Sequence, residues 1–450
     1  MHVTYIHSLD ELAQGAPLLI YGAGGRGRDL LRAAERDGLL HSVAGFVDTF
    51  KSGTFEGLPV YSLEELKIVL ARPELREARI VVASTYHRKI VRSLTERGLE
   101  ACAVLLCKDE AQPLQDVPIR DIVAVLNTHR HPLRATCADM TGRLTPGQKL
   151  RCQSFSTIYF RPSGLSLCCW MPDLVEVPEP GDAASRSRAL SRLDDIRHSL
   201  VQALDEGRNP YCANCPDAFA TNSGTLPTQF TGLHLDVSTR CNLNCSYCIV
   251  KNTAKGVDYD FEALCDHALE RGFVVNDPYF DWGGAGEPTL YPTFAERTQG
   301  LLRQGGHGLV YTNALKYSEV VAQGLAGRLR AVCSLDAGTR ETYAAIRGVD
   351  GFDTVWTNIR HYVAAGAQNL TLKYIVTAQN AAPEEISAFV DRCREEGVKQ
   401  VCISRDFYAE TVSETERRAL GRLAAECSAA GIGHHYLGTA VPQGDYAPGA

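Results

Sequence analysis

Cys241-Asn242-Leu243-Asn244-Cys245-Ser246-Tyr247-Cys248 places three thiols in one short loop. The alternating apolar run at 233–237 before it predicts a buried strand that ends where the loop begins. Three thiolates can hold three corners of a cubane iron–sulfur cluster and leave its remaining iron free to accept an outside molecule. A closed zinc site normally has four protein ligands, and no His or Cys follows Cys248 closely. The loop therefore favours an open cluster, with structural zinc as the alternative.

The Cys-x3-Cys-x2-Cys spacing at a strand end resembles that of the radical SAM superfamily. In that family the free iron of a 4Fe–4S cluster chelates the amino and carboxylate groups of S-adenosylmethionine (SAM). Reductive cleavage of SAM then yields a 5′-deoxyadenosyl radical, which abstracts a hydrogen atom from an unactivated carbon. The resemblance implies a SAM-binding 4Fe–4S cluster on Cys241, Cys245 and Cys248.

Later strand ends fit the same resemblance. The segment 280–288, Phe-Asp-Trp-Gly-Gly-Ala-Gly-Glu-Pro, resembles the family's Gly-Gly-Glu-Pro motif, which contacts the methionyl amino group. Glycine allows the backbone to approach a ligand closely, and a carboxylate can pair with an ammonium group. The segment 331–338 resembles the family's Ser-x-Asp strand end, and an Arg after it suits the SAM carboxylate. The expected cofactor-binding residues are Gly284, Gly286, Glu287, Asn313, Ser334, Asp336 and Arg347.

Composition sets broad limits on the protein. At 450 residues, with 45% hydrophobic and 22% charged residues, the chain is long enough for two or three globular domains. The net charge of −7 argues against nucleic acid as a partner. No apolar run approaches the roughly 20 residues that span a bilayer, and the first residues lack signal-peptide features. Sixteen cysteines then indicate reduced thiols and metal ligands, so we expect a cytoplasmic metalloprotein with no membrane contact.

Residues 1–106 predict a small Rossmann-like domain. A short apolar strand at 17–21 runs into Gly-x-Gly-x-x-Gly, and a helix is expected over 28–36. A second strand at 42–47 ends at an acid placed where such domains bind a ribose. The candidate ligand-binding residues are Gly22, Gly24, Gly27 and Asp48.

The first ninety or so residues also resemble the N-terminal domains of sugar-nucleotide acetyltransferases, through the runs at 45–48 and 57–60. In those domains the glycine loop binds a nucleotide sugar rather than a nicotinamide dinucleotide. A purely structural or docking domain is the alternative, because tight turns between strands and helices also use glycine for packing.

Residues 107–230 form a cysteine-rich segment. A strand at 156–160 and its return at 165–167 predict a hairpin, and a helix over 189–206 leads into a Cys-x2-Cys turn. The candidate metal ligands are Cys152, Cys168, Cys169, Cys212 and Cys215. Tetrahedral sulfur sites suit both zinc and iron–sulfur clusters, and unconnected core thiols are a further alternative.

This segment resembles the auxiliary-cluster module, called SPASM or twitch, of radical SAM enzymes. The shared features are a Cys before the hairpin, Gly-x3-Cys-Cys, and a helix followed by the Cys pair. The segment departs from the family in lying before the radical SAM core and in having too few cysteines for two clusters. The resemblance implies one auxiliary 4Fe–4S cluster, with zinc as the alternative and either Cys168 or Cys169 as a ligand.

Residues 231–450 alternate between strand and helix patterns. Strands are expected near 279–283, 308–313, 329–335, 370–376 and 400–404, in addition to the strand before Cys241. Repeated βα units indicate a parallel sheet, and six units predict a partial (β/α)6 TIM-like barrel. The expected fold class is therefore α/β, with the site at the carboxyl ends of the strands. Cys402, and less well Cys333, is a candidate hydrogen-atom donor, since strand alternation puts Cys333 opposite Ser334.

Three hypotheses follow for the reaction. The first is dehydrogenation or epimerisation of a carbohydrate or nucleotide sugar, a small-molecule substrate, with the auxiliary cluster as electron acceptor. The second is maturation of a peptide or protein, with the N-terminal domain as a docking module. The third is a metal-stabilised scaffold without catalysis. The resemblance also implies a reducing partner such as flavodoxin or ferredoxin.

Overall fold

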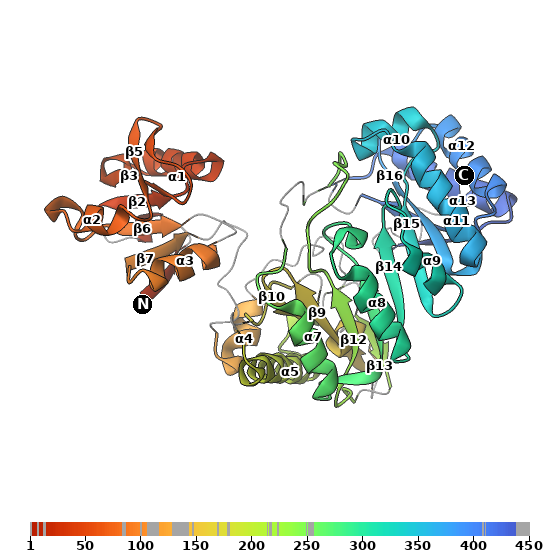
Figure 1. Cartoon of the computed structure of the whole chain (residues 1–450), viewed down its shortest axis with the longest axis horizontal. Helices are drawn as coiled ribbons and strands as arrows, with labels where there is room; N and C mark the ends of the chain where they lie inside the picture. The colour runs from red at the N-terminus through yellow and green to blue at the C-terminus, as the bar shows by residue number, and fades with distance from the viewer. Residues whose placement is uncertain are drawn as a thin grey trace. The chain divides into compact units, whose positions relative to one another are not determined.

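The protein is described by a computed structural model of the whole chain (Figure 1). The structure describes residues 2–6, 9–11, 15–82, 87–99, 101–105, 117–127, 144–145, 148–168, 171–177, 181–213, 215, 218–222, 225–248, 250, 256–406, 409 and 411–437. The chain divides into two compact units. The N-terminal unit is Met1–Gln112 with Thr128–Arg130, and the C-terminal unit is Pro113–Asn127 with His131–Ala450.

The N-terminal unit is built on a seven-stranded sheet in the order β1-β7-β6-β2-β3-β5-β4, in which only the β4–β5 pair is antiparallel. Its strands are β1 His2–Ile6, β2 Leu18–Tyr21, β3 Val43–Asp48, β4 Gly53–Phe55, β5 Leu58–Ser62, β6 Arg79–Val82 and β7 Ala101–Leu105. Its helices are α1 Gly25–Arg36, α2 Leu66–Leu70 and α3 His87–Glu96. The predicted strand–glycine loop–helix–strand unit is confirmed, because α1 connects the parallel strands β2 and β3.

Both faces of this sheet are covered, because alternate residues of β2 pack into different apolar clusters. Leu19 and Tyr21 join one cluster, and Leu18 and Ile20 join the other. Successive side chains of a strand point to opposite faces, so a run of four apolar residues is the pattern of a strand buried on both sides.

The C-terminal unit is built on a nine-stranded sheet in the order β10-β9-β12-β13-β14-β15-β16-β17-β18. Its strands are β9 Thr157–Arg161, β10 Gly164–Ser166, β12 Phe230–Leu235, β13 Val274–Trp282, β14 His307–Thr312, β15 Leu329–Ser334, β16 Leu370–Val376, β17 Gln400–Arg405 and β18 Gly433–Tyr436. A separate pair is formed by β8 Lys149–Arg151 and β11 Phe219–Thr221. The helices are α4 Ile119–Leu126, α5 Ala183–Asp205, α6 Pro210–Ala213, α7 Phe261–Glu270, α8 Phe294–Arg303, α9 Glu319–Leu325, α10 Arg340–Arg347, α11 Phe352–Gly366, α12 Pro383–Glu395 and α13 Glu414–Ala429.

The six predicted strands are present as β12 to β17, and they are adjacent and parallel in the predicted order. Two additions extend the sheet beyond the prediction. β18 pairs with β17 at one end, and β9 pairs in parallel with β12 at the other. Helix α11 was also not predicted.

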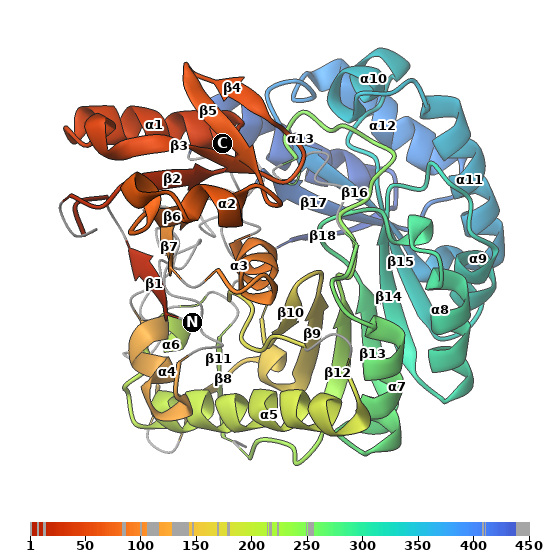
Figure 2. The ribbon, with the colours of Figure 1, turned by 60° about the vertical axis from the view of Figure 1, so that its left-hand side comes forward.

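The two faces of this sheet differ. In β16, Leu370, Leu372, Tyr374 and Val376 are buried, whereas the residues between them are only partly buried. The buried residues belong to the large apolar core that the helices complete, and α8, α9 and α11 lie along this outer face (Figure 2). The opposite face of the sheet is called the inner face below, and part of it lines a cavity.

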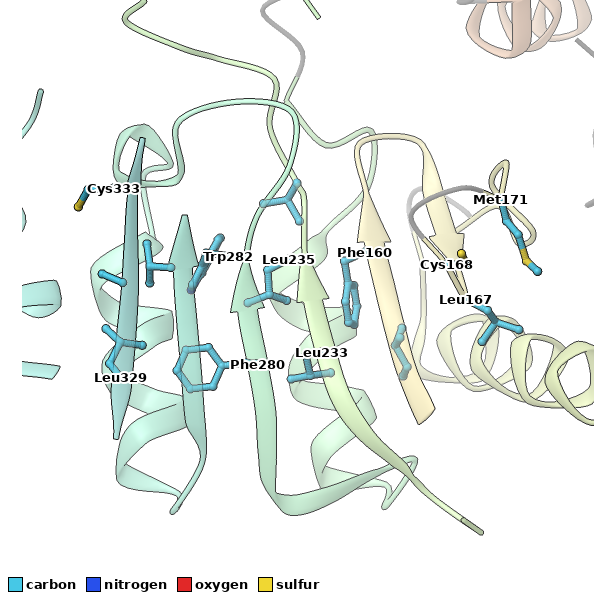
Figure 3. Close-up of a cluster of buried hydrophobic side chains, with 14 of the residues drawn as sticks. Phe160, Leu167, Cys168, Met171, Leu233, Leu235, Phe280, Trp282, Leu329 and Cys333 are labelled. Carbon is cyan, nitrogen blue, oxygen red and sulfur yellow. The ribbon is translucent and has the colours of Figure 1, made fainter. Parts of the chain in front are cut away.

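The hairpin of β9 and β10 belongs to the same core as the parallel strands. Figure 3 shows Phe160 of β9 beside Leu233 and Leu235 of β12, with Phe280 and Trp282 of β13 next to them. The cysteine-rich segment, predicted as a part of its own at 107–230, therefore contributes a strand to the main sheet of the C-terminal unit.

Candidate functional site

The cysteine loop, residues 241–248, follows β12 and is held by the end of α10. The amide of Asn244 donates to the carbonyl of Arg347 at 3.0 Å, and the amide of Ser246 donates to the carbonyl of Ile346 at 2.8 Å. Gly348 caps α10 with φ +74°, and a Cβ there would lie 2.7 Å from the carbonyl oxygen of Asn244. Glycine is therefore needed both for the helix end and for the close approach of the loop.

Arg347 and Asp336 form a buried ion pair beneath the loop. Nη2 of Arg347 lies 2.7 Å from Oδ2 of Asp336, whose side chain has no exposed surface. Nη1 of Arg347 donates to Sγ of Cys245 at 3.3 Å and to the hydroxyl of Tyr247 at 2.8 Å. The other carboxylate oxygen of Asp336 accepts from the amide of Ile375. Both residues therefore help to position the cysteine loop, and their predicted contacts with SAM stay a prediction.

Glu287 and Asn313 meet on the opposite side of the loop. Oε1 of Glu287 accepts from the hydroxyls of Thr289 and Thr312, both at 2.7 Å, and Oε2 accepts from the amide of Asn313 at 2.7 Å. Burial raises the pKa of this carboxyl above its usual value. A carboxylate has about four acceptor sites, and Oε2 has only one donor here, so it retains room for an ammonium group.

Asn313 connects this carboxylate to the cysteine loop. Its Nδ2 donates to Oδ1 of Asn242 at 2.7 Å and lies 3.7 Å from Sγ of Cys241. Two of the three thiols in the loop therefore face N–H donors, since Arg347 faces Cys245. Donors of this kind tune the potential of a thiolate-bound cluster.

At the predicted glycines 284 and 286, the loop after β13 packs closely against the loop after β12. A Cβ on Gly284, whose φ is +94°, would lie 2.6 Å from the carboxylate of Asp236. A Cβ on Gly286 would lie 2.5 Å from the carbonyl oxygen of Ser238 and 2.6 Å from that of Arg240. These glycines therefore let the motif pack against the chain that leads into the cysteine loop.

These groups line one cavity of about 380 Å³ at the carboxyl ends of the strands, called the main cavity below. Its lining includes Cys241, Cys245, Cys248, Gly284, Gly286, Glu287, Asn313, Ser334 and Arg347, which the sequence analysis singled out, and also His234 and Lys373. The volume is within the usual range of ligand pockets.

Lys373 was missed by the sequence analysis. It is the register partner of Ser334 on the neighbouring strand and faces the inner side of β16. Burial lowers the pKa of its amino group, and within the described part of the chain that group has no ion-pair partner. The signal was present in the sequence as one lysine at an alternate position of the apolar run Leu-Thr-Leu-Lys-Tyr-Ile-Val.

His234 and Asp281 were also missed. They are register partners on β12 and β13, and Nδ1 of His234 forms an ion pair with Oδ1 of Asp281. Each is a polar residue between buried neighbours of its strand, which is the pattern of a side chain on the inner face.

The two candidate hydrogen donors lie on opposite faces of the sheet. Cys333 is 1% exposed and packs in the apolar core on the helix side. Cys402 is the register partner of Lys373, so it projects from the inner face, on the same side as the main cavity. The preference for Cys402 that alternation predicted agrees with this placement.

A second group of thiols lines a small cavity beside the hairpin, called the thiol cavity below. Cys152, Cys168, Cys212 and Cys215 all contribute to its lining, together with Ser154 and Tyr211. Cys169 lies outside the described residues. Burial raises the pKa of the Cys212 thiol well above its usual value, with Cys168 as a further cause.

Among the residues that the structure describes, no three His, Cys, Asp or Glu side chains are arranged to hold a single metal ion. Tetrahedral sulfur sites suit both zinc and iron–sulfur clusters, so the four thiols of the thiol cavity do not by themselves select the metal.

The glycine loop of the N-terminal unit has the geometry expected of a nucleotide-binding turn. Gly22 has φ +105°, and a Cβ on Gly27 would lie 1.9 Å from the carbonyl oxygen of Gly22. A Cβ on Gly24 would meet nothing within 4 Å. The first and third glycines are thus required by the turn and by helix packing, while the second leaves open space.

The carboxylate of Asp48 accepts hydrogen bonds from the glycine loop and from the residues that follow β3. Its Oδ2 accepts from the amide of Ala23 at 2.8 Å, and its Oδ1 accepts from the amides of Phe50 and Lys51. Asp48 therefore helps to hold the glycine loop, and its predicted contact with a ribose stays a prediction.

Comparison with known proteins identifies the domain that carries the main cavity. Residues 235–393 match the model of the Radical SAM superfamily. These residues form a radical SAM domain. The match contains the cysteine loop, Glu287, Asp336 and Lys373. The cofactors of such a domain are a 4Fe–4S cluster and SAM, and the three thiols, the N–H donors facing them and Glu287 are a donor set that fits both.

Curated relatives match the radical SAM domain and its surroundings. A probable GTP 3′,8-cyclase of Saccharolobus islandicus is 28% identical over 174 residues, which is 38% of this chain and 54% of that protein. The mycofactocin maturase MftC of Mycobacterium tuberculosis is 27% identical over 144 residues, covering 32% of this chain and 37% of that protein. The chain thus spans about half the length of the cyclases it matches.

Solved structures also align with this chain. Streptococcus suis SuiB bound to S-adenosylmethionine aligns over 57% of this chain and 61% of its own, with a TM-score of 0.39 and 18% identity.

None of the described helices is long and apolar enough to cross a membrane.

Proposed function

We propose that this chain is an active radical SAM enzyme in which Cys241, Cys245 and Cys248 bind the SAM-cleaving cluster. The observation that carries the proposal is the convergence of all three thiols, Glu287 and Lys373 on one cavity. When bound and reduced, the cluster supplies the electron that cleaves SAM. A scaffold without catalysis would not need Glu287 to keep an acceptor site open, or a lysine at position 373 that lines the same cavity with no ion-pair partner among the described residues.

Different residues of the main cavity are assigned to different groups of SAM. Oε2 of Glu287 accepts a hydrogen bond from the methionyl ammonium group, and the glycine backbone at 284–286 adds carbonyl acceptors. Lys373 and Ser334, paired on neighbouring strands, bind the carboxylate. We assign the carboxylate to Lys373 rather than Arg347, because Arg347 already pairs with Asp336 and contacts Cys245 and Tyr247.

The thiol cavity is proposed to hold one auxiliary 4Fe–4S cluster. Cys152, Cys168, Cys212 and Cys215 converge there from the hairpin and from the turn after α5. A cluster in this position would accept an electron from a substrate radical in the main cavity, which makes a net oxidation of the substrate possible. Zinc at these thiols would leave the site structural.

Oxidative maturation of a peptide or protein is the substrate class that the comparisons favour, because one relative is named as a maturase. A carbohydrate or nucleotide sugar is the second candidate. It is supported by the glycine loop of the N-terminal unit, where Gly24 leaves open space for a phosphate-bearing ligand. If the substrate is epimerised, Cys402 is positioned on the inner face to return a hydrogen atom. Either reaction needs an electron donor such as a flavodoxin or a ferredoxin.

Anaerobic iron and sulfide analysis with EPR tests the proposal. The reconstituted chain should contain about eight irons, and SAM should perturb the EPR signal of one of two reduced clusters. Dithionite and SAM should yield 5′-deoxyadenosine. Changing Cys241, Cys245 and Cys248 together to Ala should remove about four irons and all 5′-deoxyadenosine. A wild-type chain that binds no iron would overturn the proposal, and about four irons with one zinc would overturn its auxiliary cluster.

A further inference from the structure

The wall between the main cavity and the thiol cavity carries a row of side chains. Tyr159 of β9, His234 of β12 and Asp281 of β13 are register partners on three neighbouring strands. Side chains at paired positions project from the same face of a sheet, so the three lie side by side on the inner face. His234 lines the main cavity, and Ser154, just before β9, lines the thiol cavity.

The contacts along this row are continuous. Nδ1 of His234 pairs with Oδ1 of Asp281, and both side chains are 15% exposed. The rings of Tyr159 and His234 lie against each other, with centroids 4.4 Å apart and planes tilted by 32°. The hydroxyl of Tyr159 then lies 3.2 Å from the hydroxyl of Ser154. One tyrosine ring therefore connects a residue of the main cavity to a residue of the thiol cavity.

Asp281 determines which nitrogen of His234 can act in the main cavity. A carboxylate at Nδ1 favours the tautomer that carries its proton there, and it leaves Nε2 as the acceptor. The same carboxylate supplies the countercharge when Nε2 takes up a proton. His234 is thus arranged as a proton acceptor at the cavity wall.

We propose that His234 takes up the proton and Tyr159 transmits the electron when a substrate radical in the main cavity is oxidised by the cluster of the thiol cavity. The inference rests on the proposed function, because it needs an oxidised iron–sulfur cluster at the second set of thiols. A carbon radical beside an O–H or N–H group becomes C=O or C=N when that group loses a proton and the carbon loses one electron. The proton passes to Nε2 of His234, and the electron reduces one ferric ion of the cluster to ferrous.

The charged and titratable groups around His234 come from each strand packed against it. Asp281 and Tyr159 contact it directly, and Asp236 at the end of its own strand interacts with it electrostatically. Arg161 on β9 interacts with Asp236. Tyr311 of β14 and the ring of His234 both lie close to Gly283. Tyr279 of β13 lines neither cavity, contacts the ring of His307 and does not belong to the row, which makes it a matched control.

The electron route is tested in the full chain with both clusters reconstituted and SAM bound. A flash of photoreduced deazaflavin injects one electron, and freeze-quench EPR follows its transfer from the SAM-perturbed cluster to the second cluster. Tyr159→Leu should slow this transfer by about tenfold, equivalent to about 1.4 kcal/mol of barrier, whereas Tyr279→Leu should leave it unchanged. If Tyr159→Leu fails to bind the second cluster, Tyr159→Phe, which keeps the ring but loses the contact with Ser154, should also be slower. Equal rates in wild type and both Tyr159 variants would overturn the electron route.

The proton role is tested by the midpoint potential of the second cluster, measured as a function of pH. A protonated His234 places positive charge beside Tyr159, so the potential should be higher at the acid end in wild type. His234→Gln should remove this pH dependence and retain the iron content. A wild-type potential that does not change with pH would overturn the role of His234. Absence of the second cluster, or of 5′-deoxyadenosine, would instead contradict the proposed function itself.

Discussion

Replacing Asp336 with Asn would show whether the ion pair beneath the cysteine loop holds that loop in place. Asn is close in shape to Asp and tolerates the left-handed backbone found here, where φ is +59°. Its amide oxygen can still accept from the amide of Ile375. The substitution therefore removes the negative charge facing Arg347, and it replaces the oxygen that accepts from the hydroxyl of Tyr247 with an amide nitrogen.

The expected cost follows from the burial of the pair. Asp336 has no exposed side-chain surface, the Arg347 side chain is 4% exposed, and Nη2 lies 2.7 Å from Oδ2. Removing one partner of such a pair leaves a buried charge uncompensated, which typically costs about 3–5 kcal/mol. We expect the free energy of unfolding of the C-terminal unit to fall by this amount. The cluster should also be lost, because Cys245 and Tyr247 share the same guanidinium.

Urea unfolding followed by circular dichroism, with iron analysis of the folded protein, measures both effects. Asp336→Gly retains the backbone conformation and removes the side chain, so it should be at least as destabilised. The double variant Asp336→Leu with Arg347→Met should recover much of the stability, since an apolar pair avoids the cost of burying charge. A loss below about 1 kcal/mol in Asp336→Asn, which is typical of an exposed pair, together with full iron content would refute the reasoning.

Three further variants address other parts of the protein. Gly286→Ala should cost about 1–3 kcal/mol and weaken SAM binding in equilibrium dialysis, because its Cβ would lie 2.6 Å from the carbonyl oxygen of Arg240. Unchanged affinity would argue against the close packing. Lys373→Met should abolish SAM binding yet raise stability at neutral pH by about 1–2 kcal/mol, because burial lowers the pKa of the amine. The difference should shrink as pH rises toward about 10.4, since the unfolded state then also loses its proton, and a pH-independent difference in urea unfolding would contradict this. Cys212→Ala should lower the iron content from about eight to about four, and eight irons would exclude it as a ligand.

The parallel strands and their order could be predicted from the sequence, because each strand is an apolar run followed by a helical pattern. The positions of Cys248, Glu287, Asn313 and Ser334 after those strands then placed them at one edge of the sheet, and all four line the main cavity. This part of the site follows from topology alone, without knowledge of any side-chain contact.

Contacts between segments far apart in the sequence could not be predicted in this way. One example is the buried ion pair of Asp336 with Arg347 beneath the cysteine loop. The contact depends on how α10 packs, which short-range patterns do not determine. A second example is the hydrogen bond that Asp48 accepts from the amide of Ala23 in the glycine loop.

The pairing of the hairpin with the main sheet also could not be predicted from the sequence patterns. Alternation predicted β9 and β10 as a pair, but not that β9 would add to β12 in parallel. Only that pairing puts Tyr159 beside His234, so the row between the two cavities could not have been found from spacing.

The contacts between the cysteine loop and the end of α10 have a consequence for biosynthesis. Cys245 and Arg347 are 102 residues apart, and a ribosome adding about 5–20 residues per second needs roughly 5–20 s to bridge that interval. During this time the three cysteines have emerged without the helix end that holds them. Delivery of iron and sulfide should therefore succeed only after synthesis has passed Gly348, which makes cluster insertion a late step that truncated nascent chains cannot complete.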